Sequence, residues 1–317
     1  MPFAGADLGG TKLATAVFSD DGELLHRESI PLAGRAGGAV GSLIAERLEY
    51  LVAHHDCECA GVCVPGLYRS ATGTVWAPNI PGWDDYPLLD ELRAALGPTN
   101  PVTIDSDRAA YILGETWRGA ARGARDAIFL AVGTGIGAGI LTDGRVLRGH
   151  GDVAGAIGWL ALGRPFAPRY VRHGCFEDQA SGPGLVRVAL DLMARETGYK
   201  GELLAKTAGD LDAADIFSAY DNRDAVAIEV IDNAIELWGM AAANLVSLFN
   251  PEMIVFGGGI FGPATKFLDR ISVEARRWAQ PIAIDQVRFV ASELGADAGL
   301  FGAGRLAMTS VEEEHGR

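Results

Sequence analysis

An internal duplication constrains the fold of this chain more than any other feature of its sequence. Residues 3–30 have the pattern of an apolar strand, a Gly-rich turn, a second apolar strand, an Asp-Gly turn and a third strand. Residues 127–149 repeat this order, with GTG at the first turn and an Asp-Gly pair at the second. Thr11 and Thr134 lie among glycines, where backbone N–H groups can approach an anion. We therefore predict two lobes, each with a phosphate-binding hairpin, and a nucleotide between them.

The remaining patterns predict helices and two further strands. Apolar residues at helical spacing predict helices over 38–55, 87–96, 107–121, 184–196, 224–249, 263–279 and 297–308. Short apolar runs predict strands over 253–256 and 286–292. We expect a small lobe formed by residues 1–107 plus about 297–317, and a large lobe formed by residues 108–296.

The charge of the chain argues against nucleic acid and anionic membranes as partners. Its 317 residues include 27 Lys and Arg against 41 Asp and Glu, a formal net charge of −14, and no basic patch is evident. Such a chain repels polyphosphate backbones and anionic lipid. No run approaches the ~20 apolar residues needed to cross a bilayer, and no basic segment followed by an apolar one begins the chain. We expect a cytoplasmic protein.

Cysteine usage agrees with a reducing compartment, because four cysteines in a chain of this length are too few for a disulfide framework. They are Cys57, Cys59, Cys63 and Cys175. Two of them belong to the string HHDCEC, from His54 to Cys59, which holds several potential metal ligands. Its CxC spacing differs from the CxxC usual in structural zinc sites. We interpret it as a solvated helix end and loop, with a metal site as the alternative.

Two glycine-rich nucleotide motifs can be compared with the sequence directly. The P-loop pattern GxxxxGK[ST] does not occur. The dinucleotide pattern GxGxxG occurs at Gly257, Gly259 and Gly262, between an expected strand and an expected helix. Only one further strand follows it, and a dehydrogenase would leave the duplicated hairpins unexplained. We interpret these glycines as a place where the ribose and phosphate of a nucleotide pack onto a helix start.

Six motifs occur in the order and spacing of one known family. They are DLGGTK (7–12), IDSDRAAYILGE (104–115), VGTGIGAGI (132–140), GDVAGAIGW (151–159), GCFEDQASGPGL (174–185) and VFGGGI (255–260). Over nearly the whole chain they resemble the ROK family of bacterial sugar kinases and repressors, most closely its glucokinases and fructokinases. The resemblance implies an α/β, two-lobed fold of the actin and hexokinase type (ribonuclease H-like). It also implies ATP, Mg2+, a sugar substrate and a homodimer. With a strand expected from Phe3, we expect no N-terminal DNA-binding region like that of the family's repressors.

The same resemblance implies candidate roles for individual residues. Asp107 matches the catalytic aspartate, which accepts the proton of the attacking sugar hydroxyl. Asp7 matches a residue that orients Mg2+ or its waters. Residues that match the first phosphate loop are Asp7, Gly9, Gly10, Thr11 and Lys12, and residues that match the second phosphate loop are Thr134, Gly135 and Gly137. Residues that match the adenosine-binding edge are Gly257, Gly258 and Gly259. Residues that match sugar-contacting positions are Gly66, Asn79, Ser106, Asp107 and Glu177.

Ordinary structural roles are the alternatives for three of these residues. Asp107 precedes a helical pattern and can be only a helix cap. Glu177 can be a surface carboxylate, and Asn79 a turn residue. Asp105 is interpreted as structural.

Three departures from the family pattern concern the sugar pocket. Ser106 stands in place of an Asn, and Ala156 and Trp159 stand in place of the Glu and His of the family's GExGH string. That His ordinarily binds both sugar and a structural zinc, whose other ligands come from a CxCGxxGC run. The matching stretch here, LALGRPFAPRYVRHGC, retains only Cys175, with His173 nearby. We expect no zinc there, and a small buried role for Cys175.

These departures leave three outcomes open for the acceptor. Asp152, Asp178 or Gln179 takes over the missing contacts; the substrate is a non-glucose sugar or a cyclitol; or catalysis is lost and ligand sensing remains. Trp159 can stack on an apolar sugar face. We expect an ATP-dependent kinase of the primary hydroxyl of a hexose or hexose-like polyol, with Asp107 as the base. The alternative is a catalytically weak sugar-binding or sensing protein of the same fold.

Overall fold

The computed structural model describes residues 1–196 and 198–315 and divides the chain into two compact units. Unit 1 comprises Met1–Ala124, Gly139–Gly155 and Ser292–Arg317, and unit 2 comprises Arg125–Ala138 and Ala156–Ala291. Among the described residues, no helix has the length and apolar character needed to span a bilayer.

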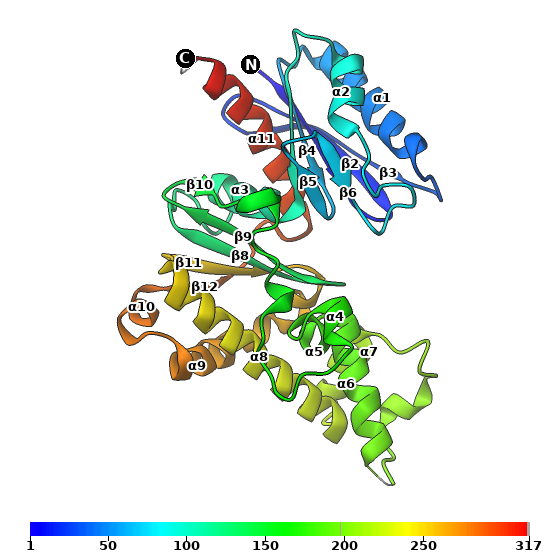
Figure 1. The fold of residues 1–317 in the computed structure, drawn as a ribbon, viewed down its shortest axis with the longest axis vertical. Helices are drawn as coiled ribbons and strands as arrows, with labels where there is room; N and C mark the ends of the chain where they lie inside the picture. The colour runs from blue at the N-terminus through cyan, green and yellow to red at the C-terminus, as the bar shows by residue number, and fades with distance from the viewer. Residues whose placement is uncertain (197, 316–317) are drawn as a thin grey trace. The chain divides into compact units, whose positions relative to one another are not determined.

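The sheet of unit 1 has five strands in the order β3-β2-β1-β4-β7 (Figure 1). Their bounds are β1 Phe3–Leu8, β2 Lys12–Phe18, β3 Leu24–Pro31, β4 Ala60–Val64 and β7 Val102–Ser106. β2 pairs antiparallel with β1 and β3, whereas β4 pairs parallel with β1 and β7. Nearly all residues of β1 and β4 are buried, because the central strands of such a sheet are covered on both faces.

Helices cover the two faces of this sheet (Figure 1). α1 (Gly38–His55) and α2 (Leu88–Leu96) share one apolar core with the strands, which includes Leu8, Leu48 and Leu92. α11 (Ala298–His315) packs on the opposite face against β1, β4 and β7, where Phe18 and Leu300 are buried. The short strands β5 (Leu67–Arg69) and β6 (Thr74–Trp76) form a separate hairpin in this unit.

α3 (Asp107–Arg118) packs along α11 at very short range. A Cβ on Gly302 would lie 1.9 Å from the carbonyl oxygen of Ala110, so only glycine permits this approach. This packing places α3 in unit 1, whereas the expected lobes assigned residues 108–124 to the large lobe. Residues 139–155 also group with unit 1.

The second sheet repeats the topology of the first, with the strand order β10-β9-β8-β11-β12. Its strands are β8 Ala127–Val132, β9 Ile136–Thr142, β10 Arg145–Val146, β11 Met253–Gly257 and β12 Arg288–Ala291. β10 pairs antiparallel with β9, and β11 pairs parallel with β8 and β12. The duplication expected from residues 3–30 and 127–149 is confirmed. The boundary between the units falls inside β9.

Most of unit 2 is helical. Its α-helices are α4 Tyr170–His173, α5 Glu177–Ala180, α6 Gly182–Arg195, α7 Ala213–Asp221, α8 Ala225–Phe249, α9 Leu268–Trp278 and α10 Pro281–Gln286. α8 contacts α5, α6, α7, α9 and α10. Its Trp238 is fully buried and donates a hydrogen bond from Nε1 to the carbonyl oxygen of Ala180 at 3.1 Å. The 3₁₀ helices of the described residues are η1 His150–Asp152, η2 Ile157–Trp159, η3 Glu202–Ala205, η4 Gly259–Phe261, η5 Pro263–Phe267 and η6 Gly295–Asp297.

β4, a central strand of the first sheet, was not predicted, and other differences occur where local polar contacts begin a helix. α7 was not predicted, although Asp212 and Asp215 form a capping box at its start. α10 (Pro281–Gln286) was also not predicted. It precedes β12 and begins where the Gln280 side chain accepts a hydrogen bond from the Ala283 N–H. The hairpin β5–β6 was also missed, and α11 continues to His315 instead of ending at 308.

Glu115, on α3, holds residues 292–294, which precede α11, through hydrogen bonds. Its side chain is fully buried, and its carboxylate accepts hydrogen bonds from Ser292 Oγ and from the N–H groups of Ala120 (2.7 Å) and Leu294 (3.2 Å). These donors lie in a turn after α3 and in the segment between β12 and α11. Removing the acceptor leaves several donors without a partner.

Replacing Glu115 by Ala is expected to lower the free energy of unfolding by about 2–4 kcal/mol, because the buried donors lose their acceptor. Alanine is a good helix former, so the loss does not come from α3 itself. Urea unfolding measures the effect. Glu46→Ala, at an exposed position of α1, is the matched control and should change stability by less than about 0.5 kcal/mol. Equal, small effects of both substitutions would contradict this role for Glu115.

Candidate functional site

Three parallel strands of unit 1 place polar residues at one edge of the sheet. Asp7 on β1, Cys63 on β4 and Asp105 on β7 are direct neighbours in the parallel register. All three strands end within three residues of these positions. In open α/β sheets, ligands bind outside the carboxyl ends of the strands. This edge of unit 1 is therefore a candidate site.

Asp107 is the first residue of α3 and directly follows β7. Its side chain is half-buried, and its Oδ1 accepts a hydrogen bond from the Arg108 N–H at 2.8 Å. Burial raises the pKa of the Asp107 carboxyl to about 6, although the nearby Arg108 lowers it in part. The helix-cap alternative does not describe this residue, because Ser106 is the residue at the cap position. Asp107 is thus a carboxylate that gains a proton near pH 6.

Asp7 lies near the end of β1, in the same region as Asp107. Burial raises the pKa of its carboxyl, while a hydrogen bond from the Cys63 thiol and the charge of Lys12 lower it. Burial, and the proximity of the Asp7 and Asp107 carboxyls, hold the pKa of the Cys63 thiol well above its usual range. Cys63 therefore stays protonated and donates to Asp7. No sequence pattern predicts this contact, which follows from the pairing of β1 with β4.

The first glycine turn connects β1 to β2. The Gly9 N–H donates to the Lys12 carbonyl oxygen at 2.9 Å, and Thr11 and Lys12 are exposed. A Cβ on Gly10 would lie 3.0 Å from Nδ2 of Asn79, so the Asn79 amide sits beside this turn. The structure thus brings Asp7, the turn and Asn79 together within unit 1.

Asp105 and Gly66 have structural roles at the same edge. Asp105 is buried, and its Oδ2 accepts hydrogen bonds from Nε (2.9 Å) and Nη2 (2.6 Å) of Arg148. The structural interpretation of Asp105 is confirmed. Gly66 has φ +90°, and a Cβ there would lie 2.3 Å from the Trp76 carbonyl oxygen. Ser106 is buried, and its N–H donates to the Asp105 carboxylate at 2.8 Å.

The second glycine turn belongs to unit 2 and connects β8 to β9. The Gly133 N–H donates to the Gly135 carbonyl oxygen at 2.9 Å, and the Gly182 N–H donates to the Gly133 carbonyl oxygen at 2.8 Å. Glu177 supports the same turn, because its Oε2 accepts a hydrogen bond from the Ile136 N–H at 2.7 Å. Thr134 is exposed in the turn, and Gly137 lies in β9.

Glu177 is a partly buried group and not a plain surface carboxylate. Burial raises its pKa, while the Ile136 hydrogen bond and the charges of His173 and Arg187 lower it. A Cβ on Gly135 would lie 2.9 Å from Glu177 Oε2, so the glycine leaves room for the carboxylate. Glu177 therefore reaches the second turn from α5.

The third glycine segment follows β11. Gly258 has φ +88°, and a Cβ there would lie 2.4 Å from the Val132 carbonyl oxygen. A Cβ on Gly257 would lie 2.2 Å from the Phe129 ring, so this glycine serves packing within the sheet. Gly259 begins the 3₁₀ helix η4. An α-helix does not start at this glycine segment, in contrast to the expectation.

A pocket of about 450 Å³ in unit 2 joins the second and third glycine segments. Its lining includes Thr134, Gly182, Pro183, Leu211, Gly259 and Ile260. Thr134 and Gly259 were expected to bind nucleotide. Residues 182–183 and 211–213 were missed as lining residues. A sequence signal was available at Ser181, a residue type that favours helix starts, whose side chain caps α6 and fixes the start of that helix beside the turn.

The positions that depart from the family pattern do not provide zinc ligands. Trp159 is 54% exposed, and Cys175 is buried as expected. The Cys175 thiol lies 3.5 Å from the donating Nε2 of Gln179, while His173 is exposed. Over residues 1–196 and 198–315, no group of three or more His, Cys, Asp or Glu is arranged to hold a metal ion. The donor set implied by the resemblance therefore does not fit zinc.

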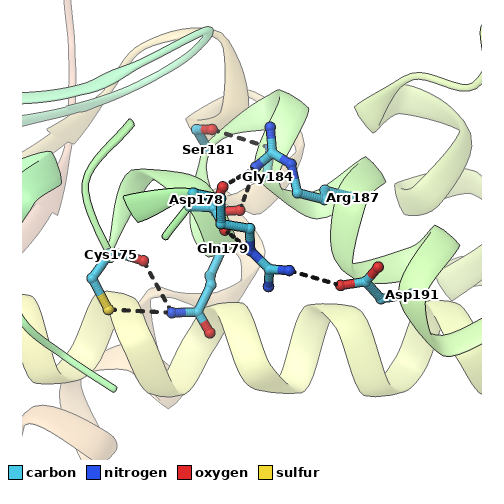
Figure 2. Close-up of polar contacts among 8 residues, drawn as sticks. Cys175, Asp178, Gln179, Ser181, Gly184, Arg187 and Asp191 are labelled. Atoms are coloured by element: carbon cyan, nitrogen blue, oxygen red, sulfur yellow. Dashed lines mark hydrogen bonds and ion pairs between the residues drawn. The ribbon is translucent and has the colours of Figure 1, made fainter. Parts of the chain in front are cut away.

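All three residues suggested as replacements make other hydrogen bonds. Asp178 is fully buried and paired with Arg169 and Arg187, so the suggestion that it contacts sugar is wrong. Gln179 donates to the Cys175 carbonyl oxygen (Figure 2). Asp152 lies in unit 1, where its carboxylate accepts hydrogen bonds from the N–H and Oγ of Ser70.

The HHDCEC string forms the end of α1 and the start of the next segment. Cys57 and Cys59 are buried in the core and not solvated, which corrects the expectation of a solvated loop. Burial raises the pKa of the Cys57 thiol to about 12. His54 Nδ1 is 2.8 Å from the carbonyl oxygen of Tyr50, and Asp56 ends the helix in the left-handed region.

Asp107→Asn is expected to stabilise the protein at pH 8. The raised pKa means that the folded state binds the proton more tightly than the unfolded chain, so ionising Asp107 costs stability as the pH rises through about 6. Removing the charge should recover about 1–3 kcal/mol at pH 8 and close to nothing at pH 4. Thermal unfolding from pH 4 to 8 measures this. Asp84→Asn, at an exposed position, is the control, and a pH-independent gain in both variants would contradict the assignment.

Comparison with known proteins supports one family. Residues 3–310 match the ROK family. Glucokinase from Halalkalibacterium halodurans is 35% identical over 315 residues, covering 96% of this chain and 94% of that protein. N-acetyl-D-glucosamine kinase from Aliivibrio fischeri is 30% identical over 275 residues, covering 81% and 84%. The structure of a ROK family glucokinase from Streptomyces griseus in complex with glucose and AMPPNP aligns with a TM-score of 0.76 and 28% identity over 98% of this chain and 100% of that one. The chain therefore belongs to the ROK family, and it has the actin and hexokinase type of fold.

Proposed function

We propose that this protein is an ATP-dependent sugar kinase that phosphorylates the primary hydroxyl of a hexose or hexose-like polyol. The observation that carries the proposal is Asp107, a half-buried carboxylate with a pKa near 6, at the same strand edge as Asp7 and the first glycine turn. Phosphoryl transfer to an alcohol requires a base beside a phosphate-binding element.

In the proposed reaction, the sugar hydroxyl oxygen attacks the γ-phosphorus of ATP. A new P–O bond forms, the bond from the γ-phosphorus to the bridging oxygen breaks, and ADP leaves. Asp107 accepts the hydroxyl proton. Its raised pKa makes the carboxylate more basic than a solvated aspartate, yet leaves it ionised at pH 7 to 8. Most of the rate then comes from positioning the reactants and from charge neutralisation.

The glycine turns support nucleotide binding. We assign the phosphates to the N–H groups of Gly10, Thr11, Thr134 and Gly135, because the Gly9, Gly133 and Ile136 N–H groups already donate within the protein. We assign the adenosine to the pocket lined by Gly182, Leu211 and Gly259. Asp7 and Lys12 are oppositely charged neighbours at the first turn. Mg2+ binds through few carboxylates, water and substrate phosphates, and Asp7 offers such a ligand or a partner for its waters. When bound, the ion neutralises phosphate charge.

The identity of the sugar is proposed only as a class. The relatives include a glucokinase and an N-acetyl-D-glucosamine kinase, so the family relationship favours both neutral and N-acetylated hexoses. Asn79, Ser106, Asp107 and Glu177 are the proposed sugar contacts, with Gly66 shaping the backbone. The exposed Trp159 ring suits the apolar face of a sugar or cyclitol.

A sugar-binding or sensing protein without effective catalysis is the second candidate. Ala156 and Trp159 lack the polar groups of the family pattern, and Asp178 and Gln179 are engaged in other contacts. A pocket with fewer polar contacts binds sugar hydroxyls less completely, at about 1–3 kcal/mol for each unpaired group. The proposal also includes a homodimer and a cytoplasmic location, which rest on the family resemblance and on the composition.

The proposed base predicts both a loss of turnover and a pH dependence. Asp107→Asn should lower kcat about 10²- to 10⁴-fold and change the Kd for AMPPNP by less than about threefold, because Asn cannot accept the proton. In the wild type, kcat/KM should fall below pH about 6, where Asp107 becomes protonated. Steady-state kinetics and calorimetry measure these quantities, with Asp84→Asn as the control. A fully active Asn variant would exclude the proposed base.

A sugar panel separates the kinase from the sensor. ADP release should be measured with glucose, mannose, N-acetylglucosamine, N-acetylmannosamine and myo-inositol in the presence of ATP and Mg2+. We expect turnover on at least one hexose that depends on Asp107. Sugar-dependent thermal stabilisation with no ADP release from any member would instead favour the sensing protein.

A further inference from the structure

A buried carboxylate paired with two partly exposed arginines lies beside Glu177 and has no role in the proposed chemistry. Asp178, on α5, has no exposed side-chain surface. Its Oδ2 accepts from Arg169 Nε at 2.7 Å, and its Oδ1 accepts from Arg187 Nη1 at 2.7 Å. Arg187 also donates to the Asp178 carbonyl oxygen at 2.7 Å (Figure 2). We call Arg169, Asp178 and Arg187 the Asp178 cluster.

The Asp178 cluster joins three segments of unit 2. Arg169 directly precedes α4, at the end of the loop that follows η2, and Arg187 lies on α6. Asp178 is on α5, between these segments in the chain. Two arginines on one fully desolvated carboxylate satisfy both of its oxygens, and removal of a partner from such a group is strongly destabilising. The cluster therefore fixes α5 relative to its neighbours.

Close backbone contacts on both sides of α5 also hold Glu177 in position. The Phe176 N–H donates to the Gly158 carbonyl oxygen at 3.0 Å, and a Cβ on Gly174 would lie 2.3 Å from the same oxygen. A Cβ on Gly184 would lie 2.6 Å from the Glu177 carbonyl oxygen. There is little space in which α5 can shift. The Glu177 carboxylate is then directed to the Ile136 N–H in the second glycine turn.

The same segment lacks a fitting donor set for zinc. The resemblance implies that a zinc ion organises the stretch before Cys175 in related proteins, with a His at the position of Trp159. Here Trp159 offers no ligand atom, and the Cys175 thiol contacts the Gln179 amide. The end of the segment from residue 160 to residue 175 is nevertheless joined to α5 by a backbone hydrogen bond, from the Asp178 N–H to the Gly174 carbonyl oxygen at 3.1 Å.

We propose that Asp178 is a positioning residue for Glu177 and that the Asp178 cluster, without a metal ion, holds the segment that zinc organises in related proteins. Fixing α5 through Arg169 and Arg187 keeps the Glu177 carboxylate on the Ile136 N–H and oriented for the sugar. Its part in sugar binding rests on the proposed function, whereas its hold on the Ile136 N–H does not.

The test compares Asp178→Asn with Asp191→Asn. Asp191 is a matched control because it contacts the same Arg169, at 3.5 Å, but on the exposed side. Hydrogen exchange of the Ile136 amide should accelerate at least about tenfold in Asp178→Asn and change less than about twofold in Asp191→Asn. The Val255 amide, in the middle of β11, reports global unfolding, and its exchange should accelerate clearly less than that of the Ile136 amide in Asp178→Asn. A folded Asp178→Asn variant with wild-type exchange at Ile136 would overturn the positioning role.

Kinetics give a second readout of the same variants. If the protein phosphorylates a sugar, Asp178→Asn should raise the KM for that sugar about tenfold or more and change the KM for ATP less than about threefold. Asp191→Asn should alter neither. Equal increases in both KM values would contradict a role confined to Glu177. If no sugar is turned over, the proposed function fails while the exchange result still decides the positioning role.

Two further measurements cover a variant that does not fold and the role of metal. If Asp178→Asn is insoluble, Arg169→Gln replaces it in the test. Arg169 is half-exposed, and its substitution removes one ion-pair partner of Asp178, so Ile136 exchange should accelerate in this variant too. Incubation of the wild type with a zinc chelator should leave its Tm and its Ile136 exchange unchanged. Stoichiometric zinc in the purified protein, with a lower Tm after chelation, would overturn the metal-free part of the proposal.

Discussion

The candidate site depends on the burial of two carboxylates, Asp7 and Asp107, at the ends of parallel strands. Asp7 and Asp107 lie at the carboxyl edge of the sheet of unit 1, where burial raises the pKa of both. α11 contributes to that burial, because a Cβ on Gly299 would lie 2.6 Å from Asp7 Oδ2. A small-residue face on one helix therefore brings backbone close to the acidic edge. The same close packing holds α3, which carries Asp107.

The duplicated topology places a short glycine turn after the first strand of each duplicated hairpin. Each sheet has a central strand that turns back into an antiparallel partner and pairs on its other side with a parallel strand. Short glycine turns leave backbone N–H groups accessible to anions at both places. The two turns differ in their support: Asn79 lies beside the first, whereas the Glu177 carboxylate accepts a hydrogen bond at the second.

The unit 2 segment around Cys175 illustrates how one structural task can be performed by different interactions. Where the family resemblance implies a metal, this chain places a carboxylate between two guanidinium groups. An ion cluster of this kind fixes neighbouring segments only when it is desolvated and fully hydrogen-bonded, as Asp178 is. This arrangement also explains why Asp178 does not replace the sugar contacts that Ala156 lacks.

Glycine turns and apolar periodicity are local signals, so the sequence alone predicts the duplicated hairpins and most long helices. The family follows from the resemblance of six motifs. The same resemblance pointed to Asp7 and Asp107 as candidate site residues. Three features follow only from the folded chain: Asp178 is buried and pairs with two arginines, Cys63 donates to Asp7, and residues 182–183 and 211–213 line a pocket. These contacts join residues on different elements, and desolvation and long-range pairing leave no periodic pattern along the chain.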